Sequence, residues 1–173
     1  SGLHEVLLGG DIPDAVRSSI AVDLGSVYSE KFQTAFRVMY EVRNGSSMDD
    51  WYEYADLVVY RALDKLIEGD RAGAEELFER LASMWDGRGF YDKASAAFEK
   101  SEGVRAYATY KCALFIYLYR ALACAGSDAV YRYSEIYTKC LEVLSAVQHP
   151  VYGGLRTEYT VDNNGDTTPF GAV

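Results

Sequence analysis

Cysteine and histidine are scarce in this sequence, which has three cysteines and two histidines among its 173 residues. There is no Cys-x-x-Cys motif, and His4 and His149 lack the spacing of paired metal ligands, so we expect no metal site. The glycine-rich phosphate loop, the dinucleotide fingerprint and the Gly-x-Ser-x-Gly nucleophile motif are also missing. We therefore expect no cofactor.

Basic charge is in deficit too, because the formal net charge is -9 at pH 7 and lysines and arginines form no cluster. Binding to nucleic-acid phosphates would work against this field, so we expect no nucleic-acid partner. Long apolar runs are missing as well. The densest one, residues 112–125, is interrupted by Arg120 and is shorter than the roughly 20 residues that a membrane helix needs. We expect no membrane insertion.

Apolar residues, in contrast, are plentiful at 49%, and tyrosine is unusually common, with 15 Tyr against 7 Phe. A chain of this length and composition can bury a sizeable core, so we expect a single domain spanning residues 1–173. Tyrosine joins an apolar ring to a polar tip, which suits helices packed beside a solvated groove.

Hydrophobic periodicity predicts helices along most of the chain. One helix starts at Asp11-Ile12-Pro13, where an N-cap residue precedes proline, and a second runs from Ser29 to about Gly45. The later helices form two pairs, each with an apolar helix followed by an amphipathic one. The expected ranges are 53–68 with 72–85, and 104–125 with 129–147.

A glycine-rich loop follows each predicted pair, DGRGFYD at residues 86–92 and YGGLRTEY at residues 152–159. The order of apolar helix, turn, amphipathic helix and loop thus occurs twice, as a loose repeat. We expect both loops to gather on one rim of the helical array. Residues 159–168, centred on Asn164-Gly165, predict a β-hairpin with a type I′ turn, so residues 151–173 form a rim loop and hairpin.

Helical hairpins of this kind, with glycine-aromatic loops on one rim, resemble the (α/α) toroids, and specifically the six-hairpin glycosidase-like superfamily. The stretches MWDGRGFYDKA and GGLRTEYT are similar to rim loops of that family, and the resemblance covers roughly residues 48–173. It implies an all-α fold of antiparallel helical hairpins forming part of an (α/α) toroid, with a short C-terminal β-hairpin. A full ring needs about twice this length, so we expect a fragment of a longer chain or association into a homo-oligomer.

The same resemblance implies a carbohydrate-active, glycoside hydrolase-like protein with a glycan-binding rim. Glycoside hydrolysis needs two carboxyl groups, about 5 Å apart for retention or about 6.5–9.5 Å apart for inversion. Asp86, Asp92 and Glu158 are the candidate catalytic residues. Ordinary turn chemistry, in which such carboxylates bond local backbone amides, is the alternative account.

Aromatic and arginine side chains near the same loops are candidates for contact with a sugar. Sugar rings stack on aromatic faces, and a guanidinium group can bind a carboxylate in bidentate fashion. Alternatively, the aromatic residues cap the core and the arginines bond loop carbonyls. The candidate substrate-binding residues are Trp85, Arg88, Phe90, Tyr91, Tyr152, Arg156 and Tyr159.

Two of the cysteines are placed symmetrically about a predicted turn. Cys112 lies fourteen residues before Gly126, and Cys140 lies fourteen residues after it. If the flanking helices fold back at that turn, both thiols lie at the same height and are candidates for a disulfide, although two separately buried thiols are equally compatible. A disulfide would favour an extracellular or cell-surface location, and its absence a cytoplasmic one.

A second function stays open beside the carbohydrate-active one. The chain could be a non-catalytic helical interaction or assembly module whose tyrosine-rich flanks bind a protein partner, since tyrosine is enriched at protein interfaces. The partners expected from the sequence are therefore a glycan, a second copy of the chain or the missing remainder of a toroid.

Overall fold

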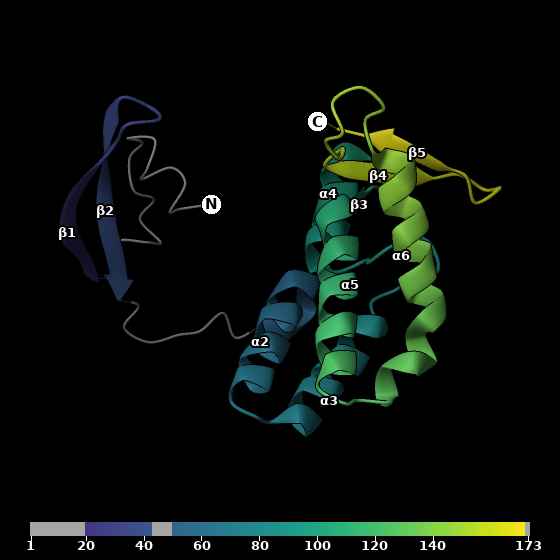
Figure 1. Ribbon diagram of the computed structural model, residues 1–173. Coiled ribbons are helices and arrows are strands. Elements are labelled where there is room, and N and C mark those ends of the chain that lie inside the picture. Colours follow the sequence, from purple (N-terminus) through teal and green to yellow (C-terminus); the bar gives the residue numbers. More distant parts are fainter. Residues whose placement is uncertain (1–19, 43–49, 172–173) are drawn as a thin grey trace. The chain divides into compact units, whose positions relative to one another are not determined.

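The structure is a computed structural model that describes residues 20–42 and 50–171 (Figure 1). The chain forms two compact units, residues 1–49 and residues 50–173, which we call the amino-terminal unit and the helical unit. The expected single domain over residues 1–173 corresponds here to these two units, and each is described by itself. The helix start predicted at residues 11–13 lies outside the described residues.

The described part of the amino-terminal unit is an antiparallel hairpin of β1 (Ile20–Ser29) and β2 (Thr34–Val42). A register shift between Asp23 and Ser26 marks a bulge in β1, where Gly25 adopts a φ of +93°. The helix predicted from Ser29 to about residue 45 is therefore wrong. Residues 36–42 contain the aromatic and β-branched residues Phe36, Val38, Tyr40 and Val42, which favour a strand over a helix.

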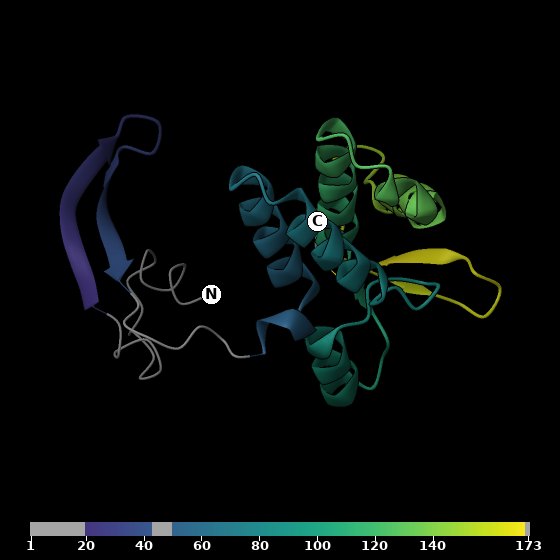
Figure 2. The ribbon, with the colours of Figure 1, turned by 90° about the horizontal axis from the view of Figure 1, so that it is seen from below.

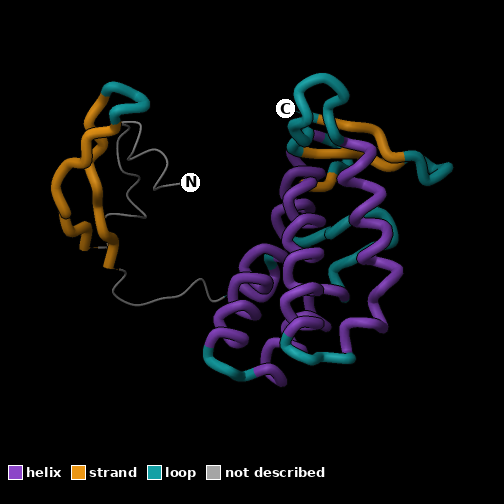
Figure 3. The backbone as a smooth tube through the Cα atoms, viewed as in Figure 1, coloured by secondary structure: helices purple, strands orange, loops and turns teal. Residues whose placement is uncertain are grey.

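The helical unit contains five α-helices, two short 3-10 helices and a small sheet among its described residues. In Figure 3, the helices run side by side and the three-stranded sheet lies at one end of them. The elements in chain order are η1 (Trp51–Glu53), α2 (Ala55–Ile67), α3 (Arg71–Ala82), α4 (Lys93–Glu102), β3 (Tyr107–Ala108), α5 (Thr109–Cys124), η2 (Ala129–Tyr133), α6 (Ser134–Val147), β4 (Glu158–Val161) and β5 (Thr167–Phe170).

The predicted all-α fold class is wrong, because the described residues form two antiparallel sheets, β1–β2 and β3–β4–β5. Helical hairpins are nevertheless present, with α2 packed on α3 and α5 packed on α6 (Figure 1). The second sheet forms because Tyr107 and Ala108 pair with Tyr159 and Glu158, fifty residues later in the chain. A pairing over such a distance leaves no local periodic signal.

Four of the predicted helices are confirmed with altered bounds. The range 53–68 contains α2, and the range 72–85 overlaps α3, which begins one residue earlier at Arg71. Asp70 caps α3 by accepting a hydrogen bond from the Gly73 amide. The helix expected over 104–125 begins only at Thr109, after β3, and the one expected over 129–147 begins as η2 before α6. Helix α4 was not predicted, although Asp92 caps it by accepting from the Ser95 amide.

The β-hairpin predicted over residues 159–168 is confirmed as β4 and β5, but its type I′ turn is wrong. A type I′ turn needs a positive φ at both central residues, and Gly165 alone in this loop has one, at +88°. The turn instead closes with a hydrogen bond from the Gly165 amide to the Asp162 carbonyl. Gly165 is thus the last of the four residues of this turn and not one of its two central residues.

The core of the helical unit is built around α5, which contacts α2, α3 and α6. Phe115 at its centre stacks on Phe78 of α3, with ring centroids 5.1 Å apart, and Phe90 lies 5.3 Å from the same ring. Fully burying one such side chain stabilises the fold by about 1.5–3 kcal/mol. Tyr107 and Tyr159 close the core at the sheet end, where both are buried.

None of the helices in the described ranges is both long and apolar enough to cross a bilayer.

Candidate functional site

The first glycine-rich loop is a tight turn between α3 and α4. Trp85 and Phe90 pair as an isolated antiparallel bridge, and the Asp86 amide donates to the Gly89 carbonyl at 3.1 Å. One carboxylate oxygen of Asp86 accepts from the amides of Arg88 and Gly89, at 2.9 and 3.0 Å. These bonds fix the backbone of residues 86–89, from which the Arg88 side chain projects.

This loop is pressed against the small sheet. The Tyr107 hydroxyl donates to the second carboxylate oxygen of Asp86 at 2.7 Å, and the Tyr159 hydroxyl donates to the Arg88 carbonyl at 3.2 Å. A Cβ atom at Gly89 would lie only 2.4 Å from the Tyr107 ring, so the close approach requires glycine. Burial and the hydrogen bond to Asp86 raise the pKa of Tyr107, which keeps this phenol protonated as a donor.

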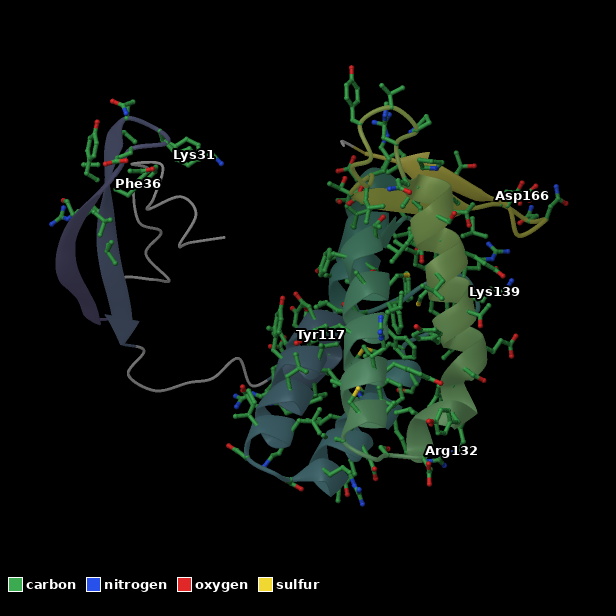
Figure 4. The ribbon with its side chains drawn as sticks, in the orientation of Figure 1. Lys31, Phe36, Tyr117, Arg132, Lys139 and Asp166 are labelled. Atoms are coloured by element: carbon green, nitrogen blue, oxygen red, sulfur yellow. The ribbon has the colours of Figure 1, made fainter. Side chains whose placement is uncertain are left out.

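A pocket of about 340 Å³ opens where this loop, α6 and the β4–β5 hairpin meet. Lys139 on α6 lies on the same side of the unit as Asp166 near the hairpin tip (Figure 4). A view turned by 90° also places the hairpin beside α6 (Figure 2). The pocket is lined by Trp85, Gly87, Arg88, Lys139, Glu142, Val143, Val161, Asp162, Asn163, Asn164, Gly165 and Thr167.

The lining combines an apolar surface with charged and amide groups. Trp85, Val143 and Val161 supply the apolar part. Lys139 donates to Glu142 at 2.8 Å, and this hydrogen bond raises the pKa of the Lys139 ammonium.

Two further lining residues have bonding capacity left over. One oxygen of Asp162 accepts from the Asn164 and Asp166 amides, at 2.8 and 2.9 Å, which leaves its other oxygen available. The guanidinium group of Arg88 has no hydrogen-bond or ion-pair partner within the part of the chain that the structure describes. Arg88 can therefore bind an acceptor in the pocket without first breaking another contact.

The catalytic candidate Asp92 has no access to a substrate in this structure. Its side chain is 0% exposed and forms an ion pair at 2.7 Å with Lys111, whose side chain is 3% exposed. One carboxylate oxygen also accepts from the Ser95 amide and hydroxyl, and the other accepts from the Ala55 amide at 2.9 Å. Asp92 thus joins the start of α2, the start of α4 and the first turn of α5.

The other two catalytic candidates differ from Asp92 and from each other. Both carboxylate oxygens of Asp86 accept hydrogen bonds, one from the turn amides and the other from Tyr107. A guanidinium nitrogen of Arg105 lies 3.7 Å from the oxygen that Tyr107 bonds. Glu158 lies half-buried in β4, opposite Phe170, and is absent from the pocket lining. The structure therefore does not gather the three carboxylates at the pocket. Asp86 bonds local backbone amides, as the alternative interpretation of these carboxylates expected.

The predicted substrate-binding residues are dispersed over four environments. Trp85 and Arg88 line the pocket, whereas Phe90 and Tyr159 are buried in the core. Tyr91 donates to Glu99 at 2.7 Å, which lowers the pKa of Glu99, and its ring lies beneath the Arg105 guanidinium. The remaining two lie in the loop after α6, where Tyr152 is 81% exposed and Arg156 donates to the Gly171 carbonyl.

The two predicted rim loops therefore meet only in part. The first loop contacts β4 through Tyr159, but the second loop folds on itself after α6, where the His149 amide donates to the Gly154 carbonyl at 2.7 Å. Sequence reasoning missed the α6 wall of the pocket. Lys139 and Glu142 are three residues apart and form an ordinary solvated ion pair, which offers no signal of a site.

The disulfide candidates Cys112 and Cys140 are both buried and both free thiols in the structure, whereas Cys124 is exposed. In the described ranges, no cluster of three or more histidine, cysteine or carboxylate side chains could hold a metal ion.

Comparison with known proteins gives no relative for this chain. No protein-family model matches the sequence. No curated protein and no solved structure matches it significantly.

Proposed function

We propose that the helical unit is a carbohydrate-binding module that holds a sugar in the pocket between Trp85, α6 and the β4–β5 hairpin, without hydrolysing it. The observation that supports the proposal most is the pocket lining, in which an indole and two valines lie beside the Arg88 guanidinium, which has no partner among the described residues, and beside an Asp162 oxygen that is still available. The C–H faces of a sugar pack on aromatic and apolar surfaces, and its hydroxyls need convergent donors and acceptors.

The dimensions and the carboxylates limit what the pocket does. A volume of about 340 Å³ lies at the small end of the usual range for ligand sites, which suits one or two sugar rings. Hydrolysis needs one carboxyl group on each side of the glycosidic bond. Asp92 is enclosed with Lys111, and Glu158 is not in the lining. The two carboxylates that do line the pocket are already bonded, Glu142 to Lys139 and Asp162 to the Asn164 and Asp166 amides, so binding without bond cleavage is the function that this geometry favours.

Tryptophan fluorescence tests the proposal directly, because Trp51 and Trp85 are the two tryptophans of the chain. In a Trp51→Phe variant, the emission reports on Trp85 alone, and titration with a panel of neutral and acidic mono- and disaccharides should produce a saturable change. Arg88→Ala in that background should weaken binding about tenfold or more, since a charged hydrogen bond contributes about 1.5–3 kcal/mol.

Arg132→Ala is the matched control, because Arg132 pairs with Glu79 and is absent from the pocket lining. Figure 4 shows it at the far end of the α6 segment from Asp166. Equal losses in the Arg88 and Arg132 variants, or no sugar that changes Trp85 emission, would contradict the binding site. Release of reducing sugar that disappears in Glu142→Gln or Asp162→Asn, the two carboxylates of the pocket lining, would contradict the absence of hydrolysis.

A second candidate function, association between copies of the chain, is supported by a tyrosine-bearing surface on α2 and α5. Tyr60, Tyr110 and Tyr117 on these two packed helices are 51%, 48% and 62% exposed. Figure 4 shows Tyr117 projecting from α5. Tyrosine is enriched at interfaces, and a two-fold dimer uses the same patch on both copies.

Sedimentation velocity over a range of protein concentrations tests this candidate. Tyr60→Ser combined with Tyr117→Ser should shift a dimer toward monomer, whereas the equally exposed Tyr131→Ser on η2 should not. A wild-type chain that stays monomeric at every concentration would exclude self-association through this surface.

A further inference from the structure

The charged side chains of the pocket are paired unequally. Arg88 and Lys139 are the cations of the lining, and Glu142 and Asp162 are its carboxylates. The Lys139 ammonium donates to Glu142 at 2.8 Å, and one Asp162 oxygen accepts from two backbone amides. Of these four groups, the Arg88 guanidinium alone has no hydrogen-bond or ion-pair partner among the residues that the structure describes. A cation without a counter-charge in a pocket favours a ligand that carries an anionic group.

The backbone of Arg88 is held on both sides of the residue. Its amide donates to the Asp86 carboxylate at 2.9 Å, and its carbonyl accepts from the Tyr159 hydroxyl at 3.2 Å. A ligand that binds the guanidinium therefore needs to order the side chain of Arg88 but not its backbone. The entropic cost of binding is reduced accordingly.

A guanidinium group distinguishes the acidic form of a sugar from its neutral form. Its planar fork donates two parallel N–H bonds to a carboxylate, whereas a hydroxymethyl group offers a single neutral oxygen. A hexuronic acid and its parent hexose differ in this one group, because carbon 6 is a carboxylate in the first and a hydroxymethyl group in the second. Arg88 is therefore suited to select the acid.

The other lining groups suit the remainder of such a ring. Trp85 is partly exposed, and its indole packs edge-on against Phe90 with ring centroids 5.1 Å apart, which restricts its motion. The available oxygen of Asp162 accepts a hydrogen from a sugar hydroxyl. The same carboxylate repels a second anionic group, so the pocket fits a ligand with one carboxylate and several hydroxyls.

We propose that the ligand of this pocket is a hexuronic acid, whose carboxylate binds Arg88 and whose hydroxyls donate to Asp162, an assignment that rests on the proposed sugar-binding function. The whole chain has a formal net charge of -9, so its general field disfavours an anionic ligand. The preference for the acid is therefore a local property of the pocket and depends on Arg88.

The test measures the affinity of matched sugar pairs in the Trp51→Phe chain at pH 7, followed by the emission of Trp85. The pairs are glucuronate with glucose and galacturonate with galactose. In each pair that binds, the acid should bind about five- to tenfold more tightly than its parent hexose, because a charge-assisted hydrogen bond is roughly twice as strong as a neutral one.

Two substitutions at Arg88 separate charge from geometry. Arg88→Gln removes the charge and should remove or reverse the preference, since Glu142 and Asp162 remain in the lining. Arg88→Lys keeps the charge without the planar fork and should retain part of the preference. Arg132→Gln is the matched control, because it changes the net charge equally, outside the pocket, and should leave the preference intact.

The outcomes distinguish a failure of this assignment from a failure of the proposed function. If no sugar changes the emission of Trp85, the pocket binds no sugar and both are wrong. If a hexose binds as tightly as its acid, or if Arg88→Gln leaves the preference unchanged, the sugar site remains and the assignment to hexuronic acids is overturned.

Sodium acetate and inorganic phosphate test for a site that takes any small anion. Neither should change the emission of Trp85 at the concentration at which glucuronate saturates, because neither has a ring to pack on the indole. An equal response to either anion would overturn the assignment to a sugar acid.

Discussion

The amino-terminal hairpin and the helical unit use similar apolar residues with opposite results. Val27, Phe36 and Val38 of the hairpin are 61%, 40% and 36% exposed, whereas Val58 and Phe115 of the helical unit are fully buried. Among the described residues of its unit, the two-stranded hairpin has no second layer over its face, and local pairing alone does not bury apolar surface. In the helical unit, α5 is covered from three sides.

The same difference extends to charged groups. In the helical unit, the carboxylate of Asp92 and the ammonium of Lys111 are buried. The fold tolerates these two charges because each is bonded to the other. The stability of the helical unit thus depends on a few enclosed groups, whereas Val27, Phe36 and Val38 of the hairpin stay partly or largely exposed.

Asp92→Ala is expected to have the largest effect on stability, lowering the free energy of unfolding by about 3–5 kcal/mol. The substitution leaves the Lys111 ammonium buried without a counter-charge and removes the acceptor for the Ala55 and Ser95 amides. Urea denaturation followed by tryptophan fluorescence measures the change, because Trp51 and Trp85 both belong to the helical unit.

Two further variants test whether the loss of stability comes from burying an unpaired charge or from the loss of any ion pair. Asp50→Ala removes an exposed partner of Lys93 and should leave stability close to that of the wild type. Asp92→Ala combined with Lys111→Met should be more stable than Asp92→Ala alone, because the uncompensated ammonium is gone. A double variant as unstable as the single one would show that the charge is not what matters.

Acidification should weaken the helical unit through the same carboxylate. Burial alone would raise the pKa of Asp92, but the Lys111 ammonium and the Ala55 and Ser95 amides outweigh it and hold this pKa below its ordinary value of 3.8. A carboxyl with a lowered pKa stabilises the fold above its unfolded-state pKa, and that contribution is lost as the pH falls through the folded-state pKa.

Urea titrations between about pH 6 and pH 2 measure this loss, which should begin near pH 4. The Asp92→Ala, Lys111→Met double variant should lose less stability over the same interval than the wild type does. Parallel pH profiles for the two proteins would rule out Asp92 as the group responsible.

Tyr159→Phe should cost about 1–2 kcal/mol of unfolding free energy, because one buried hydroxyl bonds both the Arg88 carbonyl and Cys112. Tyr117→Phe is the control, since Tyr117 is exposed and its hydroxyl has no partner among the described residues. If both variants unfold at the same urea concentration, the loop from Trp85 to Phe90 is not held by Tyr159.

Phe36→Ser in the hairpin should have the smallest effect, with the urea midpoint of the helical unit unchanged within about 0.5 kcal/mol. Phe36 is partly exposed, and the fluorescence reports only on the unit that contains both tryptophans. Phe115→Ala, its buried counterpart, should cost about 3–5 kcal/mol. A large effect of Phe36→Ser would contradict the contrast between exposed hairpin side chains and buried side chains of the helical unit.

Local sequence patterns predicted the parts of the fold whose contacts lie close together in the chain. The positions of α2, α3, α5 and α6 follow from apolar periodicity, and the β4–β5 hairpin follows from its Asn-Gly turn signal. In β2 two local signals conflict, because Ser29 fits a helix N-cap whereas the aromatic and β-branched residues of 36–42 favour a strand. Helix α4 was missed although Asp92 stands at its N-cap.

The candidate site was predicted only where it depends on one loop. Trp85 and Arg88 were identified because their glycine-rich turn is a local signal, and both line the pocket. Lys139 and Val143 belong to the opposite wall and resemble ordinary residues of an amphipathic helix. Asp92 resembled a loop carboxylate, since nothing near it in the sequence indicates that Lys111 will enclose it.

Local sequence is enough to place the helices of the two packed pairs, the hairpin that follows them and the tight turn at residues 86–89, because each depends on neighbours a few positions away. Long-range packing is what brings Tyr107 into the sheet, joins Asp92 to Lys111 in the core and places Arg88 and α6 around one pocket. Those three outcomes depend on packing between residues that are far apart in the chain, and such packing leaves no periodic trace in the sequence.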